Sequence, residues 1–231
     1  MAMGVKRKNQ SLENSEVYRL YKDIIESIKQ PVTSIKKNTF IVEDIPKDNR
    51  IIPVIYQAAI DSWKNFVREV HCYKVNENEF EITILFENEQ LRKHGKWDIF
   101  YRIFRRLWYG RVTDIETFRI ILNEGKPVKL EFKGIFSDEY SIEDDNIHGD
   151  KRVDGKVPLH DIKYYFNDEK HPVIFINTAN HAMSYHDTNH KLWKWEYIPW
   201  EKDSAIVYGQ KPRSQFERFL WPLNRFIGHE E

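Results

Sequence analysis

The spacing of hydrophobic residues changes several times along the chain between a helical and an extended pattern. Apolar side chains recur at intervals of three and four in five segments, and Pro31, Gly110 and Gly125 mark the ends of three of them. This periodicity predicts five helices, at residues 15–30, 52–70, 97–109, 113–125 and 215–227.

Alternating or continuous apolar runs mark eight extended segments, of which about six or seven are expected to form strands. The clearest is a hairpin in which 72–75 pairs with 80–86 around residues 76–79. Val173–Ile176 is continuously apolar, which indicates a strand covered on both faces. Further extended segments are predicted at 39–45, 128–136, 162–166, 192–200 and 205–208.

Strands and helices do not alternate regularly in this prediction. The expected fold class is therefore α+β, with a mixed α/β sheet as the alternative. Residues 1–12 are basic and polar and are expected to form a disordered tail, and residues 13–231 to form a single globular domain. The polar stretch 137–158 is expected to be a loop inside that domain.

Composition narrows the classes of function. Lys plus Arg and Asp plus Glu both number 36, so a protein that is basic throughout is excluded, whereas a local cationic patch is not. Cys72 is the only cysteine, which excludes a disulfide scaffold and cysteine-rich zinc modules. No apolar run approaches the length of a transmembrane helix, and the first ten residues lack the apolar run of a signal peptide. We expect a cytoplasmic protein.

A histidine cluster follows the buried strand and has the pattern H-D-x-x-H. If this segment is helical, His186 and His190 share one face and together ligate a divalent metal ion. Asp187 would act as a base or a further ligand, because it occupies the position of the glutamate in zinc proteases. Asn180 and His181 leave the end of the strand, where ligands bind in α/β sheets, and are the other candidate catalytic residues.

The cluster has a second interpretation. Asp is shorter than Glu, and Thr188 and Asn189 are poor helix formers. The two histidines would then be hydrogen-bonding members of an aromatic surface that also contains Tyr185, Trp193 and Trp195.

The predicted helix 97–109 combines arginines with tyrosines. Residues 92–111 contain seven Lys or Arg and one acidic residue. Arginines bind phosphates and tyrosines stack on bases, so this helix suits nucleic acid, and it would also suit an anionic membrane surface. The candidate phosphate-binding residues are Tyr101, Arg102, Arg105, Arg106 and Tyr109. The alternative is an ordinary solvated helix face whose arginines pair with acids elsewhere in the fold.

Two functional hypotheses follow, and whether the protein is an enzyme stays open between them. The first is a metal-dependent hydrolase that acts on a phosphodiester through the His/Asp cluster. The second is a non-catalytic module that binds nucleic acid or a protein through the basic aromatic helix, with a protein partner or a homo-oligomer as further expected partners.

Overall fold

The computed structural model of this chain describes residues 51–89, 97–108, 111–144, 153–166, 169–199 and 206–217. All of them belong to the second of the two units into which the chain divides, Met1–Asp44 and Ile45–Glu231. The predicted tail and the predicted elements at 15–30 and 39–45 lie outside the described residues, as does most of the predicted helix 215–227. The predicted domain boundaries therefore stay a prediction.

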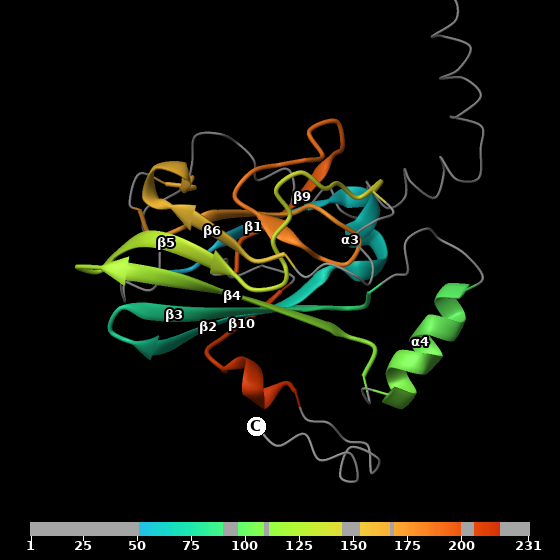
Figure 1. The fold of residues 1–231 in the computed structure, drawn as a ribbon. Helices are drawn as coiled ribbons and strands as arrows, with labels where there is room; N and C mark the ends of the chain where they lie inside the picture. The colour runs from blue at the N-terminus through green and yellow to red at the C-terminus, as the bar shows by residue number, and fades with distance from the viewer. Residues whose placement is uncertain are drawn as a thin grey trace, which may run out of the picture. The chain divides into compact units, whose positions relative to one another are not determined.

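The larger sheet has six strands in the order β10-β2-β3-β4-β5-β6 (Figure 1). Its central strands form antiparallel neighbours in chain order, and β10 joins β2 in parallel. The strands are β2 (Val67–Asn76), β3 (Glu79–Phe86), β4 (Asp114–Asn123), β5 (Lys126–Phe132), β6 (Gly155–Pro158) and β10 (Val207–Gly209).

The smaller sheet has four strands in the order β8-β7-β1-β9. They are β1 (Val54–Ala58), β7 (Val173–Ile176), β8 (Met183–Ser184) and β9 (Lys194–Tyr197). β1 pairs in parallel with β7, where Val54 is opposite Val173, and antiparallel with β9. Ile174 and Ile176 of β7 are 0% and 2% exposed, which confirms the prediction of a buried strand from its continuous apolar run.

Two α-helices and two 3-10 turns complete the described elements. They are α3 (Ala59–Asn65), α4 (Trp97–Trp108), η2 (Leu159–Asp161) and η3 (Arg213–Gln215). None of the helices in the described ranges has both the length and the apolar character needed to cross a membrane.

Both sheets contribute to one hydrophobic core. Ile55 and Ile174 of the smaller sheet belong to the same buried cluster as Ile84 and Phe118 of the larger one. The backbone also links the sheets near β8, because Met183 donates its N–H to Ile135 over 2.5 Å. Each fully buried side chain of this kind stabilises the fold by about 1.5–3 kcal/mol relative to its exposed state.

The predicted α+β fold with about five helices is wrong. The described residues form ten strands in two mixed sheets and only two α-helices. The predicted helix 52–70 is a strand, a short helix and a strand, β1, α3 and β2. Its apolar stripe included Trp63 and Phe66, which are 42% exposed. Two distant strands pair with β1 on either side, and local periodicity contains no information about such partners.

The predicted helix 113–125 is also wrong, because β4 occupies most of it. Phe118, Ile120 and Leu122 alternate into the core with a period of two. The helix prediction rested on the overlapping set Ile115, Phe118, Ile121 and Leu122, which has helical spacing. β-branched residues favour the extended form here. The predicted loop 137–158 ends in β6, and residues 162–166 form only an isolated bridge, from Tyr164 to Pro172.

Other predicted elements are confirmed. The hairpin is β2–β3, with Cys72 opposite Ile82. The predicted strand 128–136 overlaps β5, which ends at Phe132, and the predicted helix 97–109 contains α4. The extended segments 192–200 and 205–208 contain β9 and β10.

Candidate functional site

A tight turn after β7 places His181 inside the protein. The His181 N–H donates to the Thr178 carbonyl over 3.0 Å, and the Ala182 N–H donates to Thr178 Oγ1 over 2.9 Å. His181 has a φ of 60°, a left-handed conformation that histidine adopts more readily than most residues. The turn leaves the His181 side chain 0% exposed.

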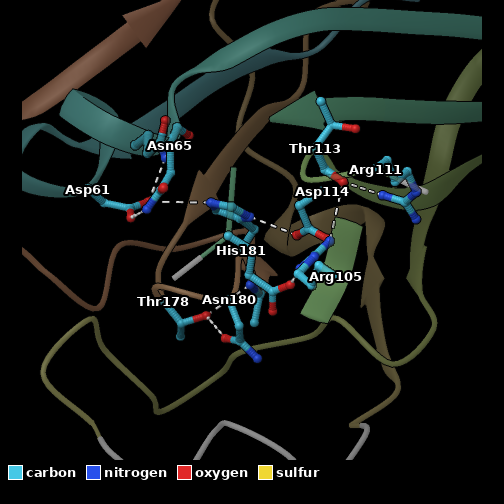
Figure 2. A network of polar contacts seen from close by, with 12 residues as sticks. Asp61, Asn65, Arg105, Arg111, Thr113, Asp114, Thr178, Asn180 and His181 are labelled. Atoms are coloured by element: carbon cyan, nitrogen blue, oxygen red, sulfur yellow. Dashed lines mark hydrogen bonds and ion pairs between the residues drawn. The ribbon is translucent and has the colours of Figure 1, made fainter. Parts of the chain in front are cut away.

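The His181 ring lies between the carboxylates of Asp61 and Asp114 (Figure 2). Its Nδ1 lies 2.8 Å from Asp114 Oδ2, and its Nε2 lies 3.7 Å from Asp61 Oδ2. The ring stacks on Phe86 with the centroids 3.7 Å apart and the planes 2° from parallel. Asp61 belongs to α3 and Asp114 begins β4, so this one side chain joins a helix to a strand.

Asp114 extends the network to α4 through Arg105. Arg105 Nη2 donates to Asp114 Oδ1 over 3.1 Å and to the Thr113 carbonyl over 3.2 Å. Glu89 forms a second ion pair with the same guanidinium. Burial alone would raise the pKa of Asp114, but the hydrogen bond to His181 and the charges of His181 and Arg105 outweigh burial and hold this pKa at about 2.

Asp61 is anchored at the other end of the network. Its Oδ2 accepts from Gln57 Nε2 over 2.5 Å, and its Oδ1 accepts from Asn65 Nδ2 over 2.7 Å. Tyr197 of β9 donates its hydroxyl to Gln57 Oε1 over 2.9 Å. Hydrogen bonds and ion pairs therefore run from β9 through α3 and His181 to β4 and α4. We call Asp61, His181, Asp114 and Arg105 the His181 network.

A partly open cavity of about 380 Å³ lies beside the two helices that this network holds. Its lining comes from α3, the segment that follows β3, α4 and the segment that precedes β4: Lys64, Glu87, Asn88, Arg102, Ile103, Arg106 and Val112. Asp61 precedes Lys64 by one turn of α3, and Arg105 lies between Arg102 and Arg106 on α4. The His181 network therefore fixes both helices that bring cations to the cavity.

The charges in the cavity are mostly positive. Lys64, Arg102 and Arg106 form no ion pair with any described residue. The one acid in the lining, Glu87, is bound by Arg68 over 3.3 Å. Three cations held around one cavity repel each other, and an anionic ligand would relieve that repulsion.

Asn88 is the least exposed residue named in the cavity lining, at 4%. Among the described residues, neither its Oδ1 nor its Nδ2 has a hydrogen-bond partner, and the same holds for Arg102 Nε. Leaving a buried polar group without a partner costs about 1–3 kcal/mol, so these three enclosed atoms lower the stability of this region.

The described members of the predicted phosphate-binding set do not share one site. Arg102 and Arg106 line the cavity. Arg105 is 4% exposed, and its charge is already paired with two carboxylates, so it positions α4 instead of facing solvent. Tyr101 is half-buried, with Arg105 5.8 Å from its ring centroid. Tyr109 lies outside the described residues.

The segment of the predicted metal ligands is not helical, so the premise that placed His186 and His190 on one helix face is wrong. His186 Nδ1 lies 3.1 Å from Ser184 Oγ, and His190 Nδ1 lies 2.9 Å from the Asp187 carbonyl. Asp187 pairs with Lys194 over 2.9 Å. In the described ranges no group of three or more His, Cys, Asp or Glu residues is arranged to hold a metal ion. The metal site stays a prediction.

The other two candidate catalytic residues lie in the turn after β7. Asn180 accepts from Thr178 Oγ1 over 2.5 Å and is half-buried. His181, the neighbour of Asn180, is enclosed in the network and has no exposed surface. Its surroundings therefore suit a positioning role.

Sequence reasoning missed Asp61, Asp114, Lys64 and Asn88. Asp61 and Lys64 fall within the predicted helix 52–70, and Asp114 falls within the predicted helix 113–125. His181 and Asp114 are 67 residues apart, so no local spacing could have paired them. The one usable signal was the polar turn directly after the buried strand, which marked His181 as a candidate catalytic residue but gave no indication of its buried contacts with Asp61 and Asp114.

No protein-family model, curated protein or solved structure matches this chain.

Proposed function

We propose that this protein is a non-catalytic module that binds a phosphate-bearing ligand, with single-stranded nucleic acid as the ligand class. The observation that carries the proposal is that Lys64, Arg102 and Arg106 converge on one cavity from two helices. Arginine and lysine side chains bind phosphate oxygens through charge-assisted hydrogen bonds, about twice as strong as neutral ones.

Exposed aromatic residues beside the cavity favour a single strand over a duplex. Trp63 precedes Lys64 on α3, and the Phe66 carbonyl accepts from the N–H of the lining residue Glu87 over 2.9 Å. Trp63 and Phe66 are each 42% exposed. Cations together with exposed aromatic faces are what sequence-tolerant single-strand binding uses, because every base has a face on which to stack.

The predicted cytoplasmic location belongs to this proposal. Its support is that Cys72, the one cysteine of the chain, is buried in β2.

The metal-dependent hydrolase remains the competing hypothesis. Elemental mass spectrometry of the wild type and of a His186→Ala/His190→Ala variant tests it, because stoichiometric metal that disappears from a folded variant would favour the hydrolase.

The direct test of the proposal is fluorescence anisotropy with a labelled single-stranded oligonucleotide. Arg102→Glu/Arg106→Glu should weaken binding by more than about ten-fold, because both phosphate contacts become repulsive. The matched control is Lys133→Glu/Lys191→Glu, which makes the same change in net charge at exposed positions outside the cavity. Equal losses in both variants, or no loss in either, would refute binding at the cavity.

A second candidate function, self-association, is favoured by an exposed apolar stripe on α4, which shares Ile103 with the cavity lining. Ile99, Ile103 and Leu107 follow each other by one turn and are 65%, 50% and 56% exposed. A continuous apolar stripe of this kind suits burial against another protein surface. Analytical ultracentrifugation of the wild type should show a dimer that Ile99→Gln/Leu107→Gln converts to monomer. A monomeric wild type at high concentration would rule this candidate out.

A further inference from the structure

Three half-buried side chains form a row across one face of the smaller sheet. Tyr56 of β1 is opposite Phe175 of β7 on one side and opposite Glu196 of β9 on the other. Residues that are directly opposite one another project from the same face of a sheet. Their chain neighbours Ile55 and Ile174 belong to the hydrophobic core, so the row lies on the face that points away from the core.

The Glu196 carboxylate is held by hydroxyl groups and not by a cation. Tyr56 donates its hydroxyl to Oε1, and Tyr165 donates its hydroxyl to Oε2 over 3.4 Å. Within the described ranges Glu196 forms no ion pair, and the ammonium of Lys194, two residues earlier on β9, lies 2.9 Å from Asp187 instead. A carboxylate accepts about four hydrogen bonds, so about two sites on Glu196 remain for a further donor.

Aromatic rings border this carboxylate. Tyr56 and Phe175 stack with their ring centroids 5.4 Å apart and their planes 23° from parallel. The face of such a ring attracts a cation that lies within about 6 Å of the centroid. Burial, followed by the hydrogen bond to Glu196, raises the pKa of Tyr56, so its hydroxyl keeps its proton and remains a donor to the carboxylate.

We propose that this face binds a lysine or arginine side chain of a partner polypeptide, with the cationic head on Glu196 and Tyr56 and the aliphatic stem along Phe175. Both side chains join a charged head to an apolar stem, which matches a carboxylate at one end of an aromatic row. A metal ion would need several oxygen ligands, and no group of three or more His, Cys, Asp or Glu residues in the described part of the chain could hold one.

The proposed site is separate from the phosphate-binding cavity. None of Tyr56, Phe175 and Glu196 belongs to the lining of that cavity, and their ligand has the opposite charge. The inference therefore goes beyond the proposed function, and either of them can fail without the other.

NMR titrations with three blocked tripeptides test the requirement for charge. Each peptide has one central residue between two alanines: arginine, lysine, or citrulline, which has the shape of arginine without its charge. The wild type should bind the arginine and lysine peptides with shifts of the Tyr56 and Glu196 backbone amides. Its affinity for the citrulline peptide should be lower than for the arginine peptide by more than about ten-fold, because the charge-assisted hydrogen bonds to Glu196 are lost.

Glu196→Gln is the matched variant, because glutamine has the same length and its carbonyl oxygen still accepts a tyrosine hydroxyl. It should lose the preference for arginine over citrulline. The control Glu139→Gln makes the same change in net charge at an exposed position and should keep that preference. A purely structural role for Glu196 would instead lower the urea midpoint of Glu196→Gln and leave the wild type unable to distinguish arginine from citrulline.

Three results would overturn the proposal. They are no binding of any peptide, equal affinities of the wild type for the arginine and citrulline peptides, and an arginine preference that survives in Glu196→Gln. Fluorescence anisotropy with the labelled oligonucleotide should give the same affinity for Glu196→Gln and the wild type, because Glu196 lies outside the cavity lining. A wild type that binds the arginine peptide but no oligonucleotide would refute the proposed function and support this site.

Discussion

His181 Nδ1 lies 2.8 Å from Oδ2 of Asp114, across 67 residues of sequence. This contact joins the turn after β7 to the start of β4, and the second oxygen of Asp114 continues to Arg105 of α4 over 3.1 Å. On its other side His181 approaches Asp61 of α3. Because α3 and α4 carry the cations of the cavity, a buried histidine with no access to a ligand determines where those cations lie.

Removing the His181 ring should strongly destabilise the protein. His181→Ala leaves buried carboxylates without their partner and should lower the free energy of unfolding by about 3–5 kcal/mol. His181→Asn tolerates the left-handed backbone and keeps a donor, so its loss should be smaller.

Urea unfolding of both variants measures these losses. The control is His190→Ala, an exposed histidine whose removal should change stability by less than about 0.5 kcal/mol. Equal stability of His181→Ala and His190→Ala would contradict the network.

Stability should fall on acidification through Asp114. Its pKa is about 2 in the folded protein against an ordinary 3.8, so the ionised carboxylate stabilises the fold above about pH 4. This contribution, on the order of 2 kcal/mol, is lost as the pH falls through 3.8 towards about 2. Asp114→Asn should show a shallower decline over this window in pH-dependent urea unfolding, whereas the exposed-site variant Glu139→Gln should follow the wild type. Parallel curves for wild type and Asp114→Asn would be the contrary result.

The neighbouring arginines of α4 should respond differently to removal. Arg105→Met breaks two buried ion pairs and should cost about 3–5 kcal/mol of stability. Arg106→Met removes an exposed cation of the cavity and should change stability by less than about 0.5 kcal/mol while weakening oligonucleotide binding. Urea unfolding and fluorescence anisotropy on the same two variants measure both effects. A loss of stability in Arg106→Met with none in Arg105→Met would contradict the structural role of Arg105 and the binding role of Arg106.

Replacing Gly155 tests the position of β6 at the edge of the six-stranded sheet. It starts β6, and a Cβ at this position would overlap the ring of Phe136. Gly155→Ala should therefore lower stability by about 1–3 kcal/mol, the usual effect of overpacking a core. A Gly155→Ala/Phe136→Ala double variant should lose less than the two single changes added together, because the overlap disappears. Strict additivity would mean that Gly155 and Phe136 are not in contact.

The sequence predicted those elements whose apolar pattern matches only one periodicity. β7 is a short continuous run and α4 a long amphipathic one, and both are present. The segment 52–70 and the segment of β4 satisfy a helical and an extended pattern together. What decides their structure is pairing with strands far away in the chain, such as β1 with β7 and β9.

The candidate site was predicted only in part, for the same reason. Arg102 and Arg106 could be identified from the local charge of one helix. Arg105 could not be distinguished from them, because its burial depends on Glu89 and Asp114. Lys64 and Asn88 join the cavity only through the tertiary fold, and no local motif contains either of them.

The salt dependence of oligonucleotide binding tests the central claim most directly. Each cation that neutralises a phosphate of a single strand contributes about 0.7 to the slope of log affinity against log salt. Lys64→Ala, Arg102→Ala and Arg106→Ala should each reduce the magnitude of the wild-type slope by about that amount. The exposed-site control Lys133→Ala should leave it unchanged. Three cavity variants that keep the wild-type slope would show that phosphates do not bind in this cavity.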